Sequence, residues 1–246
     1  MDIVYILRND IEGDELRYSL RSLKNLPHDK VWFFGGTRDD LKPDRQVYFE
    51  QQGVSVWQRV CSTIEEVCKN KEVSEDFYLF NDDFFIMKPV EEVPYYYDGT
   101  LLKRIEQIKK KTGGLGSLYS RKLEDTRLLL MQEHKKTYNY AVHVPMIINK
   151  KKALALLKKY KNMQMFRSVY GNYYNVGGEQ MKDCKIADDR EPDHDAVFLS
   201  TSEGSFEKNI GAFIKSVFTE ECEYEVHNNV RRELHEVEEA EATVRS

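Results

Sequence analysis

The sequence predicts an α/β fold in which a mainly parallel sheet carries helices on both faces and is followed by a helical C-terminal half. Two observations predict it. Up to about residue 80, short apolar strand-like runs alternate with helix-like segments, which is typical of a parallel sheet covered on both sides. From Pro89 onward the periodicity is that of helices.

The chain opens as a β-α-β unit. Residues 2–7 read as a strand, residues 15–25 as a helix that ends before Pro27, and residues 30–34 as a second strand closed by Gly35-Gly36. Glycine at that position permits the tight turn that ends a strand.

A further helix and strand, at residues 56–71 and 77–80, continue the alternation. In such sheets ligands bind beyond the carboxyl ends of the strands. We therefore expect the loops Arg8-Asn9-Asp10 and Asn81-Asp82-Asp83, which follow two of the strands, to converge on one crevice.

The rest of the chain reads as helices at residues 101–111, 123–136 and 150–160, the last with Asn149 as its N-cap, and a packed helix at 206–218. We expect residues 1–219 to form a single domain. Residues 220–246 are acidic and are expected to form a tail or helix, with a solvated charge run at 233–241.

Composition limits the classes of function. With 246 residues, of which 41% are hydrophobic, the chain builds a core of ordinary size, and its net charge of −5 creates no global field for nucleic acid or an anionic membrane, although a local basic patch is compatible with it. No apolar run approaches the roughly 20 residues of a transmembrane segment, and the N-terminus lacks a signal-peptide pattern, so we expect a cytoplasmic protein. Four scattered cysteines, Cys61, Cys68, Cys184 and Cys222, suit reduced thiols.

Asp82 and Asp83 lie between two apolar, aromatic runs and are the most informative residues of the chain. A carboxylate pair at the end of a buried strand is costly unless it is hydrogen-bonded or neutralised by a cation. Oxygen ligands suit Mg²⁺ or Mn²⁺, and Mg²⁺ usually takes one or two carboxylates together with substrate phosphates. The pair thus points to a diphosphate-bearing substrate, and a polar turn between strands is the other reading of Asn81-Asp82-Asp83.

Basic side chains and histidines supply further candidates. Arg17 and Arg21 share a helix face and suit phosphate oxygens, although without further context pairing with nearby surface acids is the favoured interpretation. His143, in an apolar strand-like stretch, is a candidate general base, with a satisfied core histidine as the alternative. Arg167 beside a turn is a third arginine, and His194 is either a metal ligand or part of an exposed acidic loop.

Four blocks of this sequence resemble the Stealth-type sugar-1-phosphate transferases, which include bacterial capsular polysaccharide phosphotransferases and the catalytic subunit of N-acetylglucosamine-1-phosphotransferase. Residues 15–22 match the family's second block nearly letter for letter, and residues 78–83 are similar to its aromatic strand followed by Asn-Asp-Asp. Residues 2–5, 143–145 and, more faintly, 166–167 resemble other blocks. Here Arg8-Asn9-Asp10 replaces an Asp-rich loop, and Met146 stands where a second His is often found.

The resemblance implies a fold like the A-type glycosyltransferases and a nucleotide-diphospho-sugar donor whose sugar-1-phosphate passes to an acceptor hydroxyl of a polysaccharide or glycan. It also implies Mg²⁺ or Mn²⁺. Carried over to this sequence, the resemblance implies that Asp82 and Asp83 are metal ligands. His194 is added to this expected set from the residues alone. Asp10, Asn81, Arg17, Arg21 and Arg167 are expected to bind the donor, with scaffold contacts as the alternative for Arg17 and Arg21. His143, Asp83 and Arg17 are expected to be catalytic.

Three alternatives stay open at this level. A glycosyltransferase of the same fold would release nucleoside diphosphate, and a sugar- or nucleotide-binding module would be non-catalytic. Nucleic-acid binding rests on the lysine runs at 109–111 and 150–152, which solvated helix faces explain better. A Ser/His/Asp or Cys/His hydrolase has little support, because the sequence has neither a nucleophile elbow nor a cysteine in a recognisable nucleophile context. Walker-type and dinucleotide glycine motifs are also missing.

Overall fold

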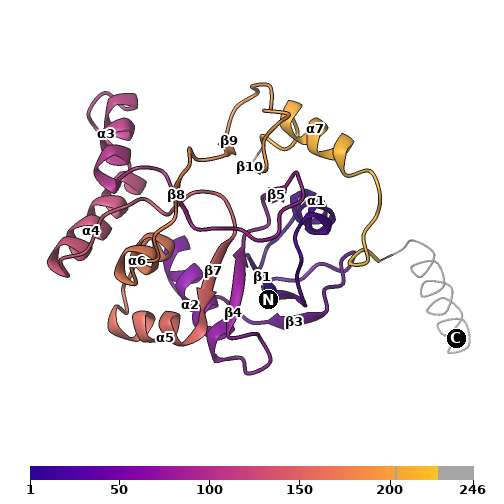
Figure 1. The fold of residues 1–246 in the computed structure, drawn as a ribbon, viewed down its shortest axis with the longest axis horizontal. Coiled ribbons are helices and arrows are strands. Elements are labelled where there is room, and N and C mark those ends of the chain that lie inside the picture. The colour runs from indigo at the N-terminus through magenta and orange to yellow at the C-terminus, as the bar shows by residue number, and fades with distance from the viewer. Residues whose placement is uncertain (203, 227–246) are drawn as a thin grey trace, which may run out of the picture.

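A central sheet of five strands organises the computed structural model, which describes residues 1–202 and 204–226 (Figure 1). Four strands are parallel, and the fifth, β7, pairs antiparallel with β4. In spatial order they are β3 (Arg45–Tyr48), β2 (Val31–Gly35), β1 (Asp2–Leu7), β4 (Asp76–Phe80) and β7 (Met146–Asn149). The predicted mixed α/β class with a mainly parallel sheet is therefore confirmed.

Helices cover both faces of this sheet, as the sequence predicts. On one face lies α1 (Glu15–Ser22), continued by the 3₁₀ turn η1 (Leu23–Asn25). On the other lie α2 (Val56–Lys69), α5 (Lys150–Lys159) and α6 (Phe166–Tyr173). Asn149 caps α5 as expected, since its side chain accepts a hydrogen bond from the Lys152 amide.

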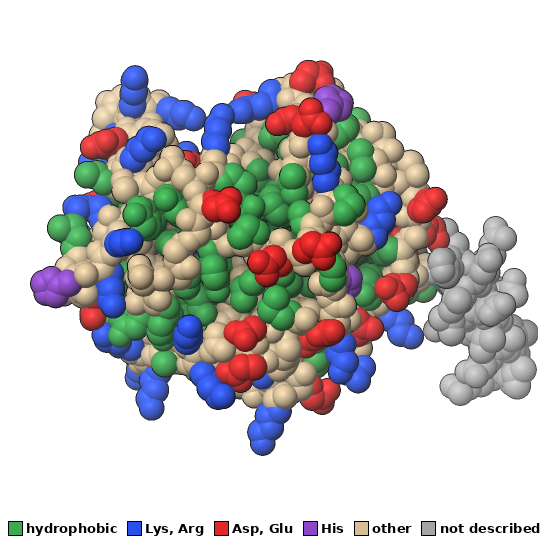
Figure 2. Space-filling model, viewed as in Figure 1, with side chains coloured by type: hydrophobic (Ala, Val, Ile, Leu, Met, Phe, Trp, Pro, Cys, Tyr) green, Lys and Arg blue, Asp and Glu red, His purple; other side chains and the backbone are tan. Residues whose placement is uncertain are grey.

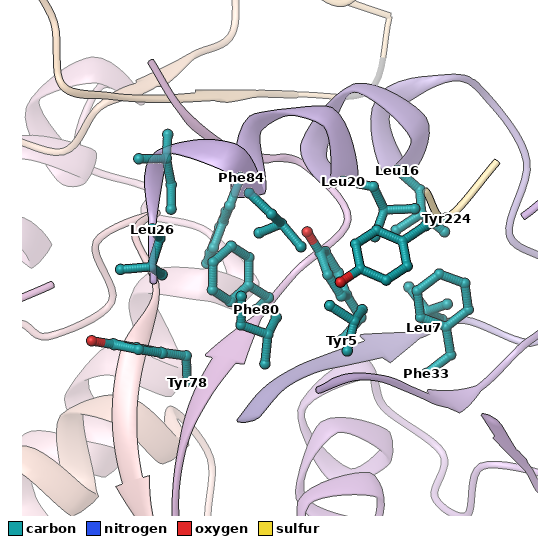
Figure 3. Packing of buried hydrophobic residues seen from close by; sticks show 14 of the residues in the cluster. Tyr5, Leu7, Leu16, Leu20, Leu26, Phe33, Tyr78, Phe80, Phe84 and Tyr224 are labelled. Carbon is teal, nitrogen blue, oxygen red and sulfur yellow. The ribbon is translucent and has the colours of Figure 1, made fainter. Parts of the chain in front are cut away.

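Strand alternation decides which side chains meet which helices. Along β1, Ile3, Tyr5 and Leu7 face α1, whereas Val4 faces the opposite layer, and all four are fully buried. Figure 3 shows the α1 side of this packing, where the leucines of the helix meet the aromatic rings of β1, β2 and β4. A central strand buried on both faces needs an apolar residue at nearly every position, and residues 2–7 supply it.

Smaller elements surround the carboxyl edge of the sheet. The strands β5 (Phe84–Ile86), β10 (Phe198–Thr201) and β9 (Lys185–Ile186) form a second sheet that packs against α7 (Asn209–Val217). A third pairing joins β6 (Tyr96–Tyr97) to β8 (Glu179–Gln180). The helices α3 (Leu101–Lys111) and α4 (Leu118–Gln132) form a hairpin that projects at the upper left of Figure 1.

Several boundaries differ from the sequence prediction. The helix expected at 123–136 begins at Leu118, because Ser117 and Ser120 form a reciprocal cap, and it ends at Gln132. The strand-like stretch from residue 140 is irregular up to Pro145 and becomes β7 only at Met146. The strands β3, β6, β8, β9 and β10 and the helix α6 were not predicted, because short segments carry too little periodicity.

The start of the expected acidic tail is part of the folded structure. Tyr224 and Glu225 are buried, and the Tyr224 carbonyl accepts a hydrogen bond from the Lys42 amide. The charge run predicted at 233–241 lies outside the described residues. In the described ranges, no helix is long and apolar enough to cross a membrane.

Candidate active site at the carboxyl edge of the sheet

The antiparallel direction of β7 brings two distant segments together. Because β7 runs opposite to β4, the residues that precede it lie at the same edge as the loop that follows β4, with Leu79 paired to Met146. His143 thus lies at the edge where Asn81-Asp82-Asp83 leaves the sheet. This is the edge at which ligands bind in α/β sheets, and the sequence singled out both segments as candidates.

The two carboxylates differ in their surroundings. Burial, and then repulsion from Asp83, raises the pKa of Asp82 to about 6, while Arg8 beyond the end of β1 acts in the opposite direction. Asp83 Oδ2 accepts hydrogen bonds from Lys185 Nζ at 2.8 Å and from Ser200 Oγ at 3.2 Å. Asp83 Oδ1 is buried and has no hydrogen-bond partner. The loop therefore holds one ion-paired carboxylate with a vacant oxygen and one that titrates near neutral pH.

Lys185 reaches Asp83 through the pairing of the second sheet. β9 lies parallel to β10 with Lys185 opposite Ser200, and β10 lies antiparallel to β5 with Ser200 opposite Phe84, the residue after Asp83. Three segments that are far apart in the sequence thus place a cation and a hydroxyl on one carboxylate. No pattern in the sequence indicated this role of Lys185.

His143 is oriented by a carboxylate that the sequence did not indicate. Its Nδ1 lies 2.8 Å from Asp183 Oδ1, and its ring meets Phe84 edge-on with centroids 6.3 Å apart. Burial is the largest single influence and opposes ionisation of Asp183. The hydrogen bond and charge of His143, together with hydrogen bonds from the backbone amides of Lys185 and His143, outweigh it and hold the pKa of Asp183 below its ordinary value. Asp183 accepts a hydrogen bond from Nδ1–H of His143. In the neutral ring the other nitrogen, Nε2, then carries the free lone pair that can take a proton.

Arg167 connects the two segments of the site instead of extending into open space. Its guanidinium donates to the carbonyls of Val144 at 2.6 Å and Leu79 at 3.3 Å, and to Asn81 Oδ1 at 3.3 Å. It also lies over the Phe84 ring, and burial lowers its pKa to about 10. Because two backbone carbonyls and the Asn81 side chain accept these hydrogen bonds, Arg167 forms a clamp that positions His143 and Asn81. Its role in binding the nucleotide sugar stays a prediction.

A cavity of about 300 Å³ opens beside these residues. Its walls combine aliphatic side chains with four aromatic residues and four polar ones, which is the composition of a typical small-molecule site. The aromatic residues are Trp57, Phe84, Tyr119 and Phe166, and the polar residues are Asn81, Arg104, His143 and Arg167. The sequence identified three of these polar residues but not Arg104, which comes from α3.

Arg17 and Arg21 lie in an internal ion-pair network. Arg17 contacts Asp14, Asp40 and Glu225, and Arg21 binds Glu225 through two nitrogens, at 2.7 and 2.8 Å. The expected catalytic role of Arg17, and donor binding by both residues, therefore receive no support from the observed contacts. The physical reason is that the α1 face they share is covered by residues 218–225, which supply the competing carboxylate and carbonyl groups.

The remaining candidates are less tightly held. Asp10 is exposed beyond β1 and lies 3.6 Å from the Arg8 guanidinium. His194 is exposed, and its ring packs against Phe213 with centroids 4.5 Å apart. Within residues 1–202 and 204–226, no group of three or more His, Cys, Asp and Glu side chains is arranged to hold a metal ion. The structure therefore does not bring His194 together with Asp82 and Asp83 as the predicted metal ligands.

The carboxylate loop is compatible with a divalent cation of the kind expected. The vacant, buried Asp83 Oδ1 is a hard oxygen donor that lacks a partner, and Asp82 can add a second carboxylate above a pH of about 6. Two carboxylates plus ligand phosphates are the usual set for Mg²⁺. Lys185 already neutralises part of the charge, so a cation and Lys185 would share Asp83.

Comparison with known proteins gives remote similarities only. No family model matches this sequence, and no curated protein matches it. Among solved structures, the chain is similar to the galactosyltransferase LgtC in complex with donor and acceptor sugar analogues, with 11% identity over 76% of each chain and a TM-score of 0.37. An active-site mutant of LgtC aligns with 11% identity, over 76% of this chain and 75% of that chain, and a TM-score of 0.38.

Proposed function

We propose that this protein is a transferase that uses a nucleotide-diphospho-sugar and moves sugar-1-phosphate to an acceptor hydroxyl. The observation that carries the proposal is the juxtaposition of the His143–Asp183 pair with the Asn81-Asp82-Asp83 loop at one edge of the sheet, beside the cavity. Such a transfer needs a base, a carboxylate loop able to hold a cation beside the diphosphate, and a concave apolar wall. The motif blocks that resemble the Stealth-type transferases support the same reading.

In the proposed reaction, the acceptor oxygen attacks the sugar-linked phosphorus of the donor. The new phosphorus–oxygen bond forms as the phosphoanhydride bond breaks, and nucleoside monophosphate leaves with the electron pair of that bond. His143 Nε2 takes the proton of the acceptor hydroxyl, while Asp183 holds the ring and offsets the charge that it gains. Arg167 keeps His143 and Asn81 in register by binding the backbone on both sides.

Asp82 and Asp83 would hold Mg²⁺ or Mn²⁺ in this proposal. Bound there, the ion would supply positive charge to the donor diphosphate. Asp83 contributes the oxygen that has no partner, and Lys185 and Ser200 fix the orientation of the carboxylate through its other oxygen.

The test is the identity of the released nucleotide. Purified protein is incubated with a panel of nucleotide sugars and Mn²⁺, with and without a chelator, and the products are identified by mass spectrometry. We expect nucleoside monophosphate that disappears on chelation, and in the Asp83→Asn variant. Asp195→Asn is the matched control, because Asp195 forms an exposed pair with Lys88 at 2.9 Å and should retain full release.

The other outcomes decide between the remaining functions. Release of nucleoside diphosphate would replace the proposal by a glycosyltransferase, in which the attack falls on the anomeric carbon. Binding of a nucleotide sugar in calorimetry, with no release in the presence of any hydroxyl acceptor tried, would favour a non-catalytic binding module. Full activity of Asp83→Asn would remove the carboxylate loop from the mechanism.

A further inference from the structure

Charge is distributed very unevenly along this chain. Residues 101–161 contain sixteen lysines and arginines but only four aspartates and glutamates, a net charge of +12, although the whole chain is at −5. In Figure 2, Lys and Arg side chains line the left and lower rims, over α3, α4 and α5, and acidic side chains gather toward the centre and right. The protein therefore presents a basic surface that its overall charge conceals.

The projecting α3–α4 hairpin within this surface also exposes apolar side chains. Its inner face is packed, with Leu101, Ile105, Leu123 and Leu130 in one buried cluster. Its outer positions carry Leu102, Leu115, Leu118, Leu128 and Met131, all of them exposed. These five make up nearly half of the exposed large hydrophobic residues in the described ranges, which concentrates solvent-exposed apolar area on a single basic element.

Leu115 occupies the tip of the hairpin. It is 93% exposed and stands in the turn Gly113-Gly114-Leu115-Gly116, where all three glycines have a positive φ. No atom lies near the positions that side chains at Gly113 and Gly114 would occupy, so the tip is open on those sides. Lys109, Lys110 and Lys111 form the last turn of α3, directly before the tip. A fully exposed leucine flanked by three lysines is poorly explained by solubility.

We propose that the α3–α4 hairpin docks on an anionic membrane surface, with Leu115 entering the interface and the lysines binding lipid headgroups. Basic residues together with exposed apolar ones are typical of elements that lie in the plane of a membrane interface. Binding of this kind needs no membrane-spanning helix. Charge complementarity selects an anionic surface. The exposed leucines favour a membrane over a soluble polyanion, because a soluble polyanion offers no apolar phase for Leu115.

The position of the hairpin connects this surface to the candidate site. Arg104 of α3 and Tyr119 of α4 line the same cavity as His143. A docked hairpin would therefore hold the cavity close to the membrane, where a membrane-borne hydroxyl acceptor would be within reach. The docking proposal does not depend on the transferase activity, since vesicle binding is measured without any nucleotide sugar.

The experiment is flotation of the full chain with vesicles of phosphatidylcholine alone or mixed with phosphatidylglycerol. We expect binding only to the anionic vesicles, weakened by about tenfold in Leu115→Ser through loss of apolar contact. Replacing Lys109, Lys110 and Lys111 together by Gln should weaken it on the order of a hundredfold. Tyr48→Ser is the matched control, because Tyr48 is exposed on β3, at the opposite edge of the sheet, and should bind as the unchanged protein does.

Insertion is measured separately with Leu115→Trp, whose added fluorescence should be quenched by brominated lipid in anionic vesicles. Absence of binding to anionic vesicles would overturn the proposal. Binding that Leu115→Ser leaves unchanged, or a DNA duplex bound as tightly as the vesicles, would also overturn it, because either result would mean a purely electrostatic surface. Quenching of the tryptophan in Leu115→Trp by brominated lipid, or weaker vesicle binding of Leu115→Ser, supports docking by the tip.

Discussion

Glu225 is expected to be one of the most important polar residues for the stability of this fold, and Glu225→Gln tests that expectation. Its carboxylate is 2% exposed and receives Arg17 at 2.8 Å and Arg21 at 2.7 and 2.8 Å. The Cys222 amide donates a further hydrogen bond at 3.0 Å. These contacts fasten the segment after α7 to α1, so their loss should weaken the whole fold rather than one end of it.

Two estimates give the size of the effect. Burial alone would raise the pKa of Glu225, but the hydrogen bonds from Arg21 and Arg17 outweigh it and lower the pKa from its ordinary 4.5 to about 2. At about 1.4 kcal/mol for each pH unit, this corresponds to about 3 kcal/mol of stability from the ionised form. Breaking a buried ion pair by removing one partner typically costs about 3–5 kcal/mol, which agrees.

The sign of the pH dependence follows from the lowered pKa. The unfolded chain binds the proton of Glu225 more tightly than the folded chain does, so this stability is fully present above pH 4.5 and is lost as the pH falls through about 2. Glu225→Gln cannot titrate. The variant should therefore be less stable near neutral pH and should lack this part of the acid destabilisation.

The assay is denaturant unfolding of the protein and its variant between pH 2 and 7. We expect Glu225→Gln to lower the free energy of unfolding by about 3 kcal/mol at pH 7 with an unchanged denaturant slope, and to lower the melting temperature by about 6–12 °C. Glu72→Gln is the control, because Glu72 forms an exposed pair with Arg45 at 3.5 Å and should cost less than about 1 kcal/mol. A loss below 1 kcal/mol for Glu225→Gln, or identical acid profiles, would refute the reasoning.

Three further predictions concern the candidate site. Because the pKa of Asp82 is about 6, Mn²⁺ affinity measured by calorimetry should rise as the pH increases from 5 to 7, and Asp82→Asn should abolish that rise; a flat profile would contradict the metal assignment. Lys185→Met should strengthen Mn²⁺ binding at pH 8 on the order of tenfold, because Lys185 competes with the ion for Asp83. The control Lys88→Met should leave Mn²⁺ affinity unchanged, and equal affinities of Lys185→Met and the unchanged protein would argue against competition. His143→Ala should lower turnover about 10²–10⁴-fold, and Asp183→Asn should lower it less with KM for the donor unchanged; a change in KM alone would make the pair a binding element.

The sequence by itself predicted the alternating strands and helices of the first 80 residues, apart from β3, and singled out two candidate segments of the site. Apolar runs such as residues 2–7 and 77–80 are long enough to bury on both faces of a sheet, so their pattern leaves little choice of structure. Asn81-Asp82-Asp83 and His143 stand out for the same reason, since each is a polar interruption in an apolar stretch. Such local contrasts can be read without knowing what lies nearby.

The tertiary structure alone decided the partners of these residues. Asp183 and Lys185 lie in a stretch without periodicity, and they meet His143 and Asp83 only because β9 and β10 pair beside β5. The same holds for Arg17 and Arg21, whose spacing suits a phosphate but whose charges are taken by Glu225, about 200 residues away. A charged residue that is distant in sequence and close in space has no effect on the local sequence pattern. Sequence patterns therefore identify a reactive residue more readily than the group that orients or neutralises it.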